Sequence, residues 1–246
     1  MTRAEAIARN LEIVRARLAS AERAADRTPG SVRLIAVSKT KSAEDIAAAL
    51  SAGQRDFGEN YAQELRDKRA DFQARDQAGA GDPARGPRWH FIGPLQSNKA
   101  KYLAGQVALV HTVDGVALLD ELERRTTPPE RTQDCLIQVN VAGEAQKRGL
   151  SPEELPGLLD RFADRPHLRC VGLMVIPPLT EDPEAARAHF AALRRLRDEE
   201  GRHVRRNVAL LELSMGMSHD LEVAVSEGAT MVRVGTAIFG ARGAEP

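Results

Sequence analysis

The stretch LIAVSKTKSAEDIAAALSAG, residues 34–53, contains one complete strand and helix. LIAVS (Leu34–Ser38) is short and rich in branched apolar side chains, which is typical of a strand buried on both faces. Ser42 is followed three residues later by Asp45, a pattern close to a capping box, and the helix that they open ends at Gly53. A strand followed at once by a helix is the repeating unit of α/β proteins.

The same unit recurs along the rest of the chain. Seven further apolar runs predict strands, at residues 55–58, 89–93, 107–113, 135–141, 168–176, 208–214 and 231–235. Eight strands alternating with helices within about 200 residues favour a closed (β/α)8 TIM barrel over an open doubly wound sheet. No GxGxxG motif follows the first strand, which argues against a dinucleotide-binding fold.

Helical periodicity fills the segments between these strands. Apolar residues at spacings of four, three and four predict an extra amphipathic helix over residues 3–26, before the first strand. After the second strand, Tyr61, Leu65 and Phe72 predict one buried face of a helix. Further helices are expected at about 97–104, at 114–125, after Ser151 and Pro152, around Ala186, Phe190 and Leu193, and near 218–227.

The helical and strand pattern has one long interruption. Residues 73–88, QARDQAGAGDPARGPR, are rich in Gly, Ala, Pro and charge and lack periodicity. We interpret them as a flexible surface loop rather than a linker, because the alternation resumes directly afterwards. Residues 1–246 are therefore expected to form a single domain.

Composition restricts the possible partners. Lys+Arg and Asp+Glu both number 35, so the chain lacks the basic excess expected of a protein that binds nucleic acid or anionic membranes. Cys135 and Cys170 each lie in an apolar run and predict neither a disulfide framework nor a metal site. The N-terminus, MTRAEAIARNLEIVRARL, has no signal-peptide core, and no stretch approaches the ~20 apolar residues of a membrane span. We expect a cytoplasmic monomer.

Ligands of such barrels bind where the strands end and the following loops begin. Position alone therefore selects Lys39, Gly58 to Asn60, His90, Asn140, Met174, Ser214 to Ser218 and Arg233 to Thr236. Lys39 ends the first strand in a chain that has only six lysines. Partial desolvation there would favour the neutral, nucleophilic amine. Lys41 is the rival nucleophile, and an ordinary solvated lysine remains the alternative.

Two glycine-containing segments follow the last two strands. LSMGMSHD, residues 213–220, offers Ser214 and Gly216, and VRVGTAIFG, residues 232–240, offers Arg233, Gly235 and Thr236. Loops after strands seven and eight form the recurrent phosphate site of TIM barrels, so together these segments favour a phosphorylated ligand. Ordinary turn chemistry is the alternative for each segment, and an internal ion pair is the alternative for Arg233.

Six motifs in order resemble the YggS/PROSC family of pyridoxal phosphate homeostasis proteins. They are AVSKTK (36–41), FGENY (57–61), WHFIGPLQSNK (89–99), GLM (172–174), LSMGMSHDLEVAV (213–225) and VRVGTAIFG (232–240). The resemblance implies a barrel similar to the N-terminal domain of alanine racemase, with pyridoxal 5′-phosphate (PLP) as cofactor. It implies Lys39 as the Schiff-base lysine and Arg233 facing the pyridine nitrogen.

The resemblance also implies a phosphate cup that includes Ser214, Gly235 and Thr236, with Asn60 and His90 lining the site. The chain departs from the family pattern at His219, where an acidic or small residue is expected, and in the length of the loop at 73–88. Neither departure touches the lysine or phosphate motifs.

The same residues bear on activity. An arginine at the pyridine nitrogen disfavours ring protonation and weakens the ring as an electron sink. Alanine racemase adds a tyrosine base from a second domain, which we do not expect in this chain. We therefore predict a PLP carrier that buffers the cofactor and supplies it to apo-enzymes. The alternatives are a weak PLP-dependent amino-acid racemase, with Tyr61 or His90 as second proton donor, and a sugar-phosphate enzyme.

Overall fold

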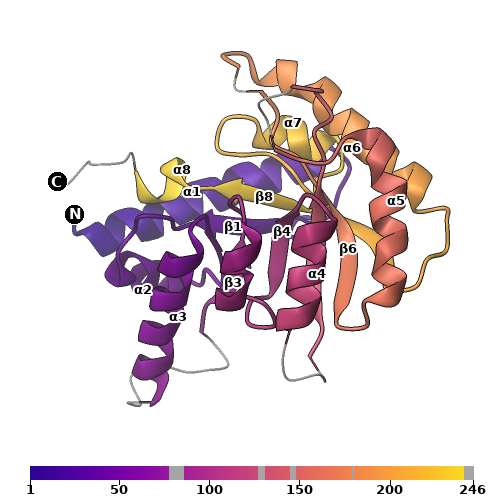
Figure 1. Ribbon diagram of the computed structural model, residues 1–246. Helices are drawn as coiled ribbons and strands as arrows, with labels where there is room; N and C mark the ends of the chain where they lie inside the picture. Colours follow the sequence, from indigo (N-terminus) through magenta and orange to yellow (C-terminus); the bar gives the residue numbers. More distant parts are fainter. Residues whose placement is uncertain (78–85, 127–130, 145–147, 179, 241–246) are drawn as a thin grey trace.

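Eight parallel strands form a closed barrel in chain order, and β8 pairs back to β1 (Figure 1). The structure is a computed structural model that describes residues 1–77, 86–126, 131–144, 148–178 and 180–240. The predicted (β/α)8 TIM barrel is confirmed. The strands are β1 (Arg33–Val37), β2 (Asp56–Glu59), β3 (Arg88–Phe91), β4 (Leu109–Val113), β5 (Gln133–Gln138), β6 (Leu168–Met174), β7 (Val208–Ser214) and β8 (Met231–Val234).

Helices surround the barrel and separate the strands (Figure 1). The α-helices are α1 (Arg3–Ala24), α2 (Ala43–Ser51), α3 (Ala62–Gln77), α4 (Val116–Arg125), α5 (Leu155–Asp160), α6 (Arg187–Glu200), α7 (Leu221–Ser226) and α8 (Thr236–Phe239). The 3-10 helices are η2 (Ser97–Tyr102), η3 (Pro152–Glu154), η4 (Arg161–Asp164) and η5 (Pro183–Ala186). Local capping explains two of the starts: Asp45 N–H donates to Ser42 Oγ over 3.2 Å, and Ser151 forms a capping box with Glu154.

Two local expectations need correction around α3. Leu65 and Phe72 are buried as predicted, but Tyr61 is 55% exposed because it precedes α3 and does not share its buried face. Residues 73–77 continue α3 instead of starting a loop, and Arg75 pairs with Asp71 one turn earlier on the solvated face of the helix. Residues 78–85 of the expected loop lie outside the described residues, and its last residue, Arg88, already belongs to β3.

Apolar side chains form two layers. The larger layer lies between the strands and the helices, and the smaller one fills the barrel with Ile35, Leu109, Leu136, Met174 and Met231. Alternate residues of a barrel strand point inward, so polar side chains at such positions must find their partners inside the barrel. This applies to several of the buried polar residues described below.

The extra N-terminal helix, α1, packs against α2, α7 and α8. Arg3 Nη2 donates to Phe239 O over 2.8 Å, and Asn10 Nδ2 donates to Ile238 O over 2.9 Å. Both acceptors are carbonyls near the C-terminal end of α8, where a helix has no further amides of its own to pair them. Helix α1 therefore holds in place α8, the short helix that follows the last strand, β8.

Both cysteines, Cys135 and Cys170, are completely buried, and burial raises the pKa of each thiol.

Within the described ranges, no helix combines the length and the apolar character that crossing a bilayer requires. The described side chains also include no group of three or more His, Cys, Asp or Glu residues placed to hold a metal ion.

Candidate functional site

A cavity of about 310 Å³ opens at the carboxyl-terminal mouth of the barrel, between the loops that follow β1, β7 and β8. These three strands are neighbours, because β7 pairs with β8 and β8 pairs with β1. The lining residues are Val37, Lys39, Thr40, Lys41, Met217, Ser218, His219, Arg233, Gly235, Thr236 and Gly240. Three of them are basic, Lys39, Lys41 and Arg233, and none of these lining residues carries a carboxylate. Such a cavity favours an anionic ligand.

Buried polar and charged groups bind the residue that precedes Lys39. Ser38 Oγ donates to Glu59 Oε1 over 2.6 Å, and Lys68 Nζ donates to Ser38 O over 2.7 Å. Lys68 Nζ also pairs with Glu59 Oε1 at 2.8 Å. Burial raises the pKa of Glu59 even though Lys68 opposes the shift. These contacts fix the backbone immediately before Lys39.

The backbone immediately after Lys39 is fixed in the same way. Thr40 has a φ of 63°, a left-handed conformation that costs energy for a β-branched residue. Its N–H donates to Glu64 Oε1 over 2.6 Å, and Lys68 Nζ pairs with the same carboxylate oxygen at 2.7 Å. We call Glu59, Glu64 and Lys68 the loop clamp, since together they bind both sides of Lys39.

Arg233 approaches the cavity from inside the barrel and is 4% exposed. Its Nη1 donates to Ser214 Oγ over 2.7 Å and its Nη2 to Val175 O over 2.9 Å. Burial lowers the pKa of the guanidinium to about 10, with Asp220 acting in the opposite direction, so the group stays charged near neutral pH. Among the described residues it forms no ion pair within contact distance. The internal ion pair considered as an alternative for Arg233 is therefore not formed with the described residues, and two neutral oxygens accept its hydrogen bonds instead.

Two glycines shape the turns around Arg233. A Cβ on Gly235 would lie 3.2 Å from Val37 Cβ, so a side chain there would crowd β1. Gly216 has a φ of 91°, and a Cβ there would lie 2.5 Å from Ala224 Cβ. Gly216 O accepts the backbone N–H of Arg233 over 2.9 Å. Gly235 thus lines the cavity, whereas Gly216 supports the turn that lines it.

The structure brings most of the predicted residues together. Lys39, Arg233, Gly235 and Thr236 line the same cavity. Ser214 is completely buried and does not line it, but it contacts Arg233 directly.

Asn60 occupies a neighbouring hollow at the same end of the barrel. This hollow, of about 210 Å³, also includes Tyr61 and Lys99. A Cβ on Gly93 would lie 2.2 Å from Asn60 O, so the glycine of WHFIG is required by the close approach of the Asn60 turn.

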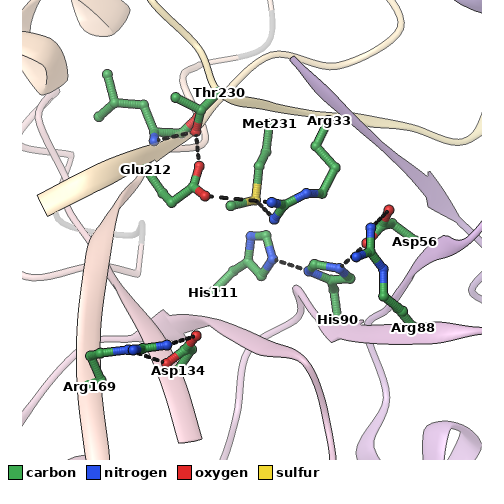
Figure 2. A network of polar contacts seen from close by, with 11 residues as sticks. Arg33, Asp56, Arg88, His90, His111, Asp134, Arg169, Glu212, Thr230 and Met231 are labelled. Carbon is green, nitrogen blue, oxygen red and sulfur yellow. Dashed lines mark hydrogen bonds and ion pairs between the residues drawn. The ribbon is translucent and has the colours of Figure 1, made fainter. Parts of the chain in front are cut away.

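His90 lies elsewhere, and its expected position at the cofactor cavity is corrected. β3 ends at Phe91, and His90 points into the barrel at 1% exposure. Its two ring nitrogens contact Asp56 and His111 (Figure 2). The cavity that it lines, of about 330 Å³, lies at the opposite, amino-terminal mouth, because Arg33 and Arg88 at the starts of β1 and β3 line it too.

Sequence reasoning missed three residues that act around the site, Glu64, Lys68 and His111. It selected Glu59 by position, as a residue that could pair with a lysine or arginine near the mouth, and Lys68 is that partner. His111 carries one usable signal, since it lies two residues from Leu109 in β4 and so shares its inward face. The loop clamp joins β2 and α3 to the β1 loop, and no spacing in the chain predicts that contact.

Comparison with known proteins places this geometry in a family. The model of the alanine racemase N-terminal domain matches residues 3–243. The pyridoxal phosphate homeostasis protein of Aquifex aeolicus is 43% identical over 242 residues, covering 98% of this chain and 99% of the relative. That of Pseudomonas aeruginosa is 45% identical over 236 residues, covering 96% of each chain.

The chain belongs to the pyridoxal phosphate homeostasis protein family. PipY of Synechococcus elongatus, solved with PLP bound, superimposes with a TM-score of 0.79 at 37% identity, covering 95% of this chain and all of PipY. Alanine racemase of Corynebacterium glutamicum superimposes with a TM-score of 0.67 at 18% identity, which shows a shared fold. The superposition covers 98% of this chain and 64% of that enzyme. The resemblance expected from the motifs is confirmed.

Proposed function

We propose that this member of the pyridoxal phosphate homeostasis protein family carries PLP as a Schiff base on Lys39, buffers it and supplies it to apo-enzymes. The observation that carries the proposal is the shared cavity of Lys39, Arg233 and the turn from β8 to α8. A nucleophilic amine, a fixed cation and a phosphate-type turn are the three parts that PLP requires, and they come from adjacent strands.

The cavity fits the cofactor in charge and in shape. Lys39, Lys41 and Arg233 complement the phosphate and the lone pair of the pyridine nitrogen, and no carboxylate among the described lining residues opposes them. Thr236 offers a hydroxyl, and the first amides of α8 have no acceptor within their own helix. A volume of about 310 Å³ is at the lower end of the range for sites of small ligands.

Lys39 would hold the cofactor covalently. Its neutral amine would form a C=N bond to the aldehyde carbon of the cofactor, with the aldehyde oxygen leaving as water. The loop clamp restrains the backbone on both sides of Lys39, so the lysine side chain starts from a fixed backbone position. A competing amine can reverse the attachment by taking the place of Lys39, which provides a route for release.

Residue placement favours a carrier over a racemase. Bound PLP supplies an electron sink, and Arg233 beside the ring nitrogen would weaken it because a cation disfavours ring protonation. The two residues considered as second proton donors do not line the cavity: Tyr61 lies in the adjacent hollow and His90 at the opposite mouth. Without such a group, about 10²–10⁴-fold of acid–base assistance is lost.

The attachment is tested by borohydride reduction of the PLP-loaded protein, followed by peptide mass mapping. We expect the reduced cofactor on Lys39, and Lys41→Ala protein should still be labelled there. Label on Lys41 or spread over surface lysines contradicts the attachment. Racemisation of common amino acids at about 1 s⁻¹, ordinary for enzymes, would favour the racemase instead.

Transfer to a partner is the second part of the proposal. We expect PLP-loaded protein to activate an apo-PLP enzyme in the cytoplasm through transient contact, with this protein acting as a monomer. Activation that proceeds no faster than with the same concentration of free PLP and that stops when a small-amine trap is added would contradict direct supply.

A further inference from the structure

A chain of hydrogen bonds crosses the barrel interior between its two mouths. Asp56 Oδ1 lies 2.9 Å from His90 Nε2, and His90 Nδ1 lies 3.0 Å from His111 Nε2 (Figure 2). His111 Nδ1 lies 2.9 Å from Ser214 Oγ, to which Arg233 Nη1 donates over 2.7 Å. We call these five side chains the interior relay. It connects the amino-terminal cavity to the arginine of the proposed cofactor site.

With both imidazoles neutral, a single arrangement of hydrogens satisfies the interior relay. Arg233 only donates, so Ser214 Oγ accepts a hydrogen bond from it. The Ser214 hydroxyl in turn donates a hydrogen bond to His111 Nδ1. His111 Nε2 then carries a hydrogen and donates to His90 Nδ1. His90 Nε2 donates in turn to the Asp56 carboxylate, which only accepts. Both rings are therefore Nε2–H tautomers, and every bond has the same direction.

The surroundings keep the two imidazoles neutral. Burial lowers the pKa of His111 well below its ordinary value, and the neighbouring His90 and Arg233 lower it further. Burial also lowers the pKa of His90, although Asp56 opposes that shift. Burial raises the pKa of Asp56, but hydrogen bonds from His90 and Arg88 outweigh this, so its pKa stays below the usual range and the carboxylate is ionised.

We propose that His111 is a positioning residue for PLP. Its Nδ1 accepts the hydrogen bond of the Ser214 hydroxyl, which directs a Ser214 lone pair at Arg233. This fixes the guanidinium that is assigned to the pyridine nitrogen. The inference rests on the proposed function and deepens it. Ser214, His111 and His90 behind Arg233 are neutral and offer no acidic proton to the ring nitrogen. By fixing the Arg233 cation, the interior relay keeps that nitrogen unprotonated and limits the bound cofactor as an electron sink.

The first test needs no cofactor. Protein labelled with ¹⁵N in histidine is examined by long-range ¹H–¹⁵N NMR, and two variants, His90→Phe and His111→Phe, assign the signals. We expect His90 and His111 both as neutral Nε2–H tautomers. An Nδ1–H tautomer or a doubly protonated ring at His111 at neutral pH overturns the proposal.

The second test uses PLP labelled with ¹⁵N in the ring, bound to wild type and to His111→Phe. We expect the wild-type nitrogen to be unprotonated and hydrogen-bonded. In His111→Phe its chemical shift should move, and PLP retention should weaken by about tenfold, the range for one hydrogen bond to a charged group. His111→Asn, whose amide oxygen can stand in for Nδ1, should recover most of both values.

A matched control separates the positioning role from general damage. Thr112 neighbours His111 in β4, is 2% exposed and donates a 2.7 Å hydrogen bond to Gly93 O outside the relay. Thr112→Val should lose stability and leave the ring-nitrogen signal unchanged. A folded His111→Phe protein with the wild-type signal and retention overturns the proposal.

If His111→Phe does not fold, His90→Leu replaces it in the second test. This variant removes the acceptor that holds the hydrogen on His111 Nε2, and it should move the cofactor signal in the same direction. An unchanged signal overturns the proposal there too. Wild-type protein that takes up no PLP refutes the proposed function, while the cofactor-free histidine signals still decide whether the interior relay exists.

Discussion

The two mouths of the barrel use charge in opposite ways. At the amino-terminal mouth, the arginines of the cavity face carboxylates: Arg169 pairs with Asp134 at 2.7 Å and Arg88 with Asp56 at 2.6 Å (Figure 2). At the carboxyl-terminal mouth, the described lining contains basic side chains and no carboxylate. Two cavities of similar volume therefore differ in net charge.

The difference indicates where a ligand is expected. Charges that are paired within the protein stabilise a barrel end and leave little field for a ligand. An excess of cations in a partly enclosed cavity attracts an anion and needs one for neutrality. The larger cavity, at about 330 Å³, is thus not the better candidate, and charge rather than size selects the candidate site.

The largest difference between the two mouths is expected when one cation is removed from each. Lys39→Ala should abolish borohydride-stable retention of PLP, because the only proposed covalent link is lost. Arg169→Ala, at the other mouth, should retain PLP as the wild type does. Mass spectrometry of the reduced proteins measures both. Equal labelling of the two variants would remove the distinction between the mouths.

The loop clamp supplies the next largest effect. Lys68→Met leaves Glu59, which is 0% exposed, without its buried partner, and loss of one member of such a pair costs about 3–5 kcal/mol of unfolding free energy. Lys101→Met, at an exposed lysine, should cost less than about 1 kcal/mol. Urea unfolding gives both values. A Lys68→Met protein as stable as the control would show that the clamp does not hold the loop.

The interior relay predicts a dependence of stability on pH. The pKa values of His90 and His111 are lowered on folding, so the unfolded chain binds more protons below the ordinary value of about 6.5. Their contribution is complete above that pH and is lost as the pH falls below it. Each histidine adds a slope of up to about 1.4 kcal/mol per pH unit.

Unfolding of wild type and His111→Phe between pH 7.5 and about 5 measures this slope. The comparison between variants cancels the opposite contribution of Glu59, whose pKa is raised on folding. The variant should lose less stability on acidification than the wild type. Identical slopes would mean that His111 is not buried as a neutral group.

The smallest effect is expected from the paired charges of the amino-terminal mouth. Arg169 is 55% exposed and Asp134 27%, so Asp134→Ala should cost about 0.2–1 kcal/mol. High salt should reduce that difference further. A cost of several kcal/mol, measured by the same urea unfolding, would mean that this mouth depends on its ion pairs far more than their exposure suggests.

The sequence predicts the barrel because its signals are local. Each strand carries its own apolar run, as LIAVS does, and each helix its own periodicity, so a short window is sufficient to identify them. The end of the first strand placed Lys39 at the carboxyl-terminal mouth for the same reason, and Lys39 lines the cavity there. Strand ends were less exact: WHFIG was expected to extend to Gly93, whereas β3 ends at Phe91. His90 was expected at the cofactor cavity, but its inward side chain lines the amino-terminal cavity instead.

Local sequence thus determined the strand and helix order, the lysine at the first strand and the glycine turns after the last two. Only the tertiary structure decided which polar side chains meet inside the barrel. Ser214 and Arg233 come from β7 and β8, whereas His90 and His111 come from β3 and β4, and their hydrogen bonds span up to 103 residues of chain. The physical reason is that barrel closure sets the distances between inward side chains of different strands, and no single strand contains that information.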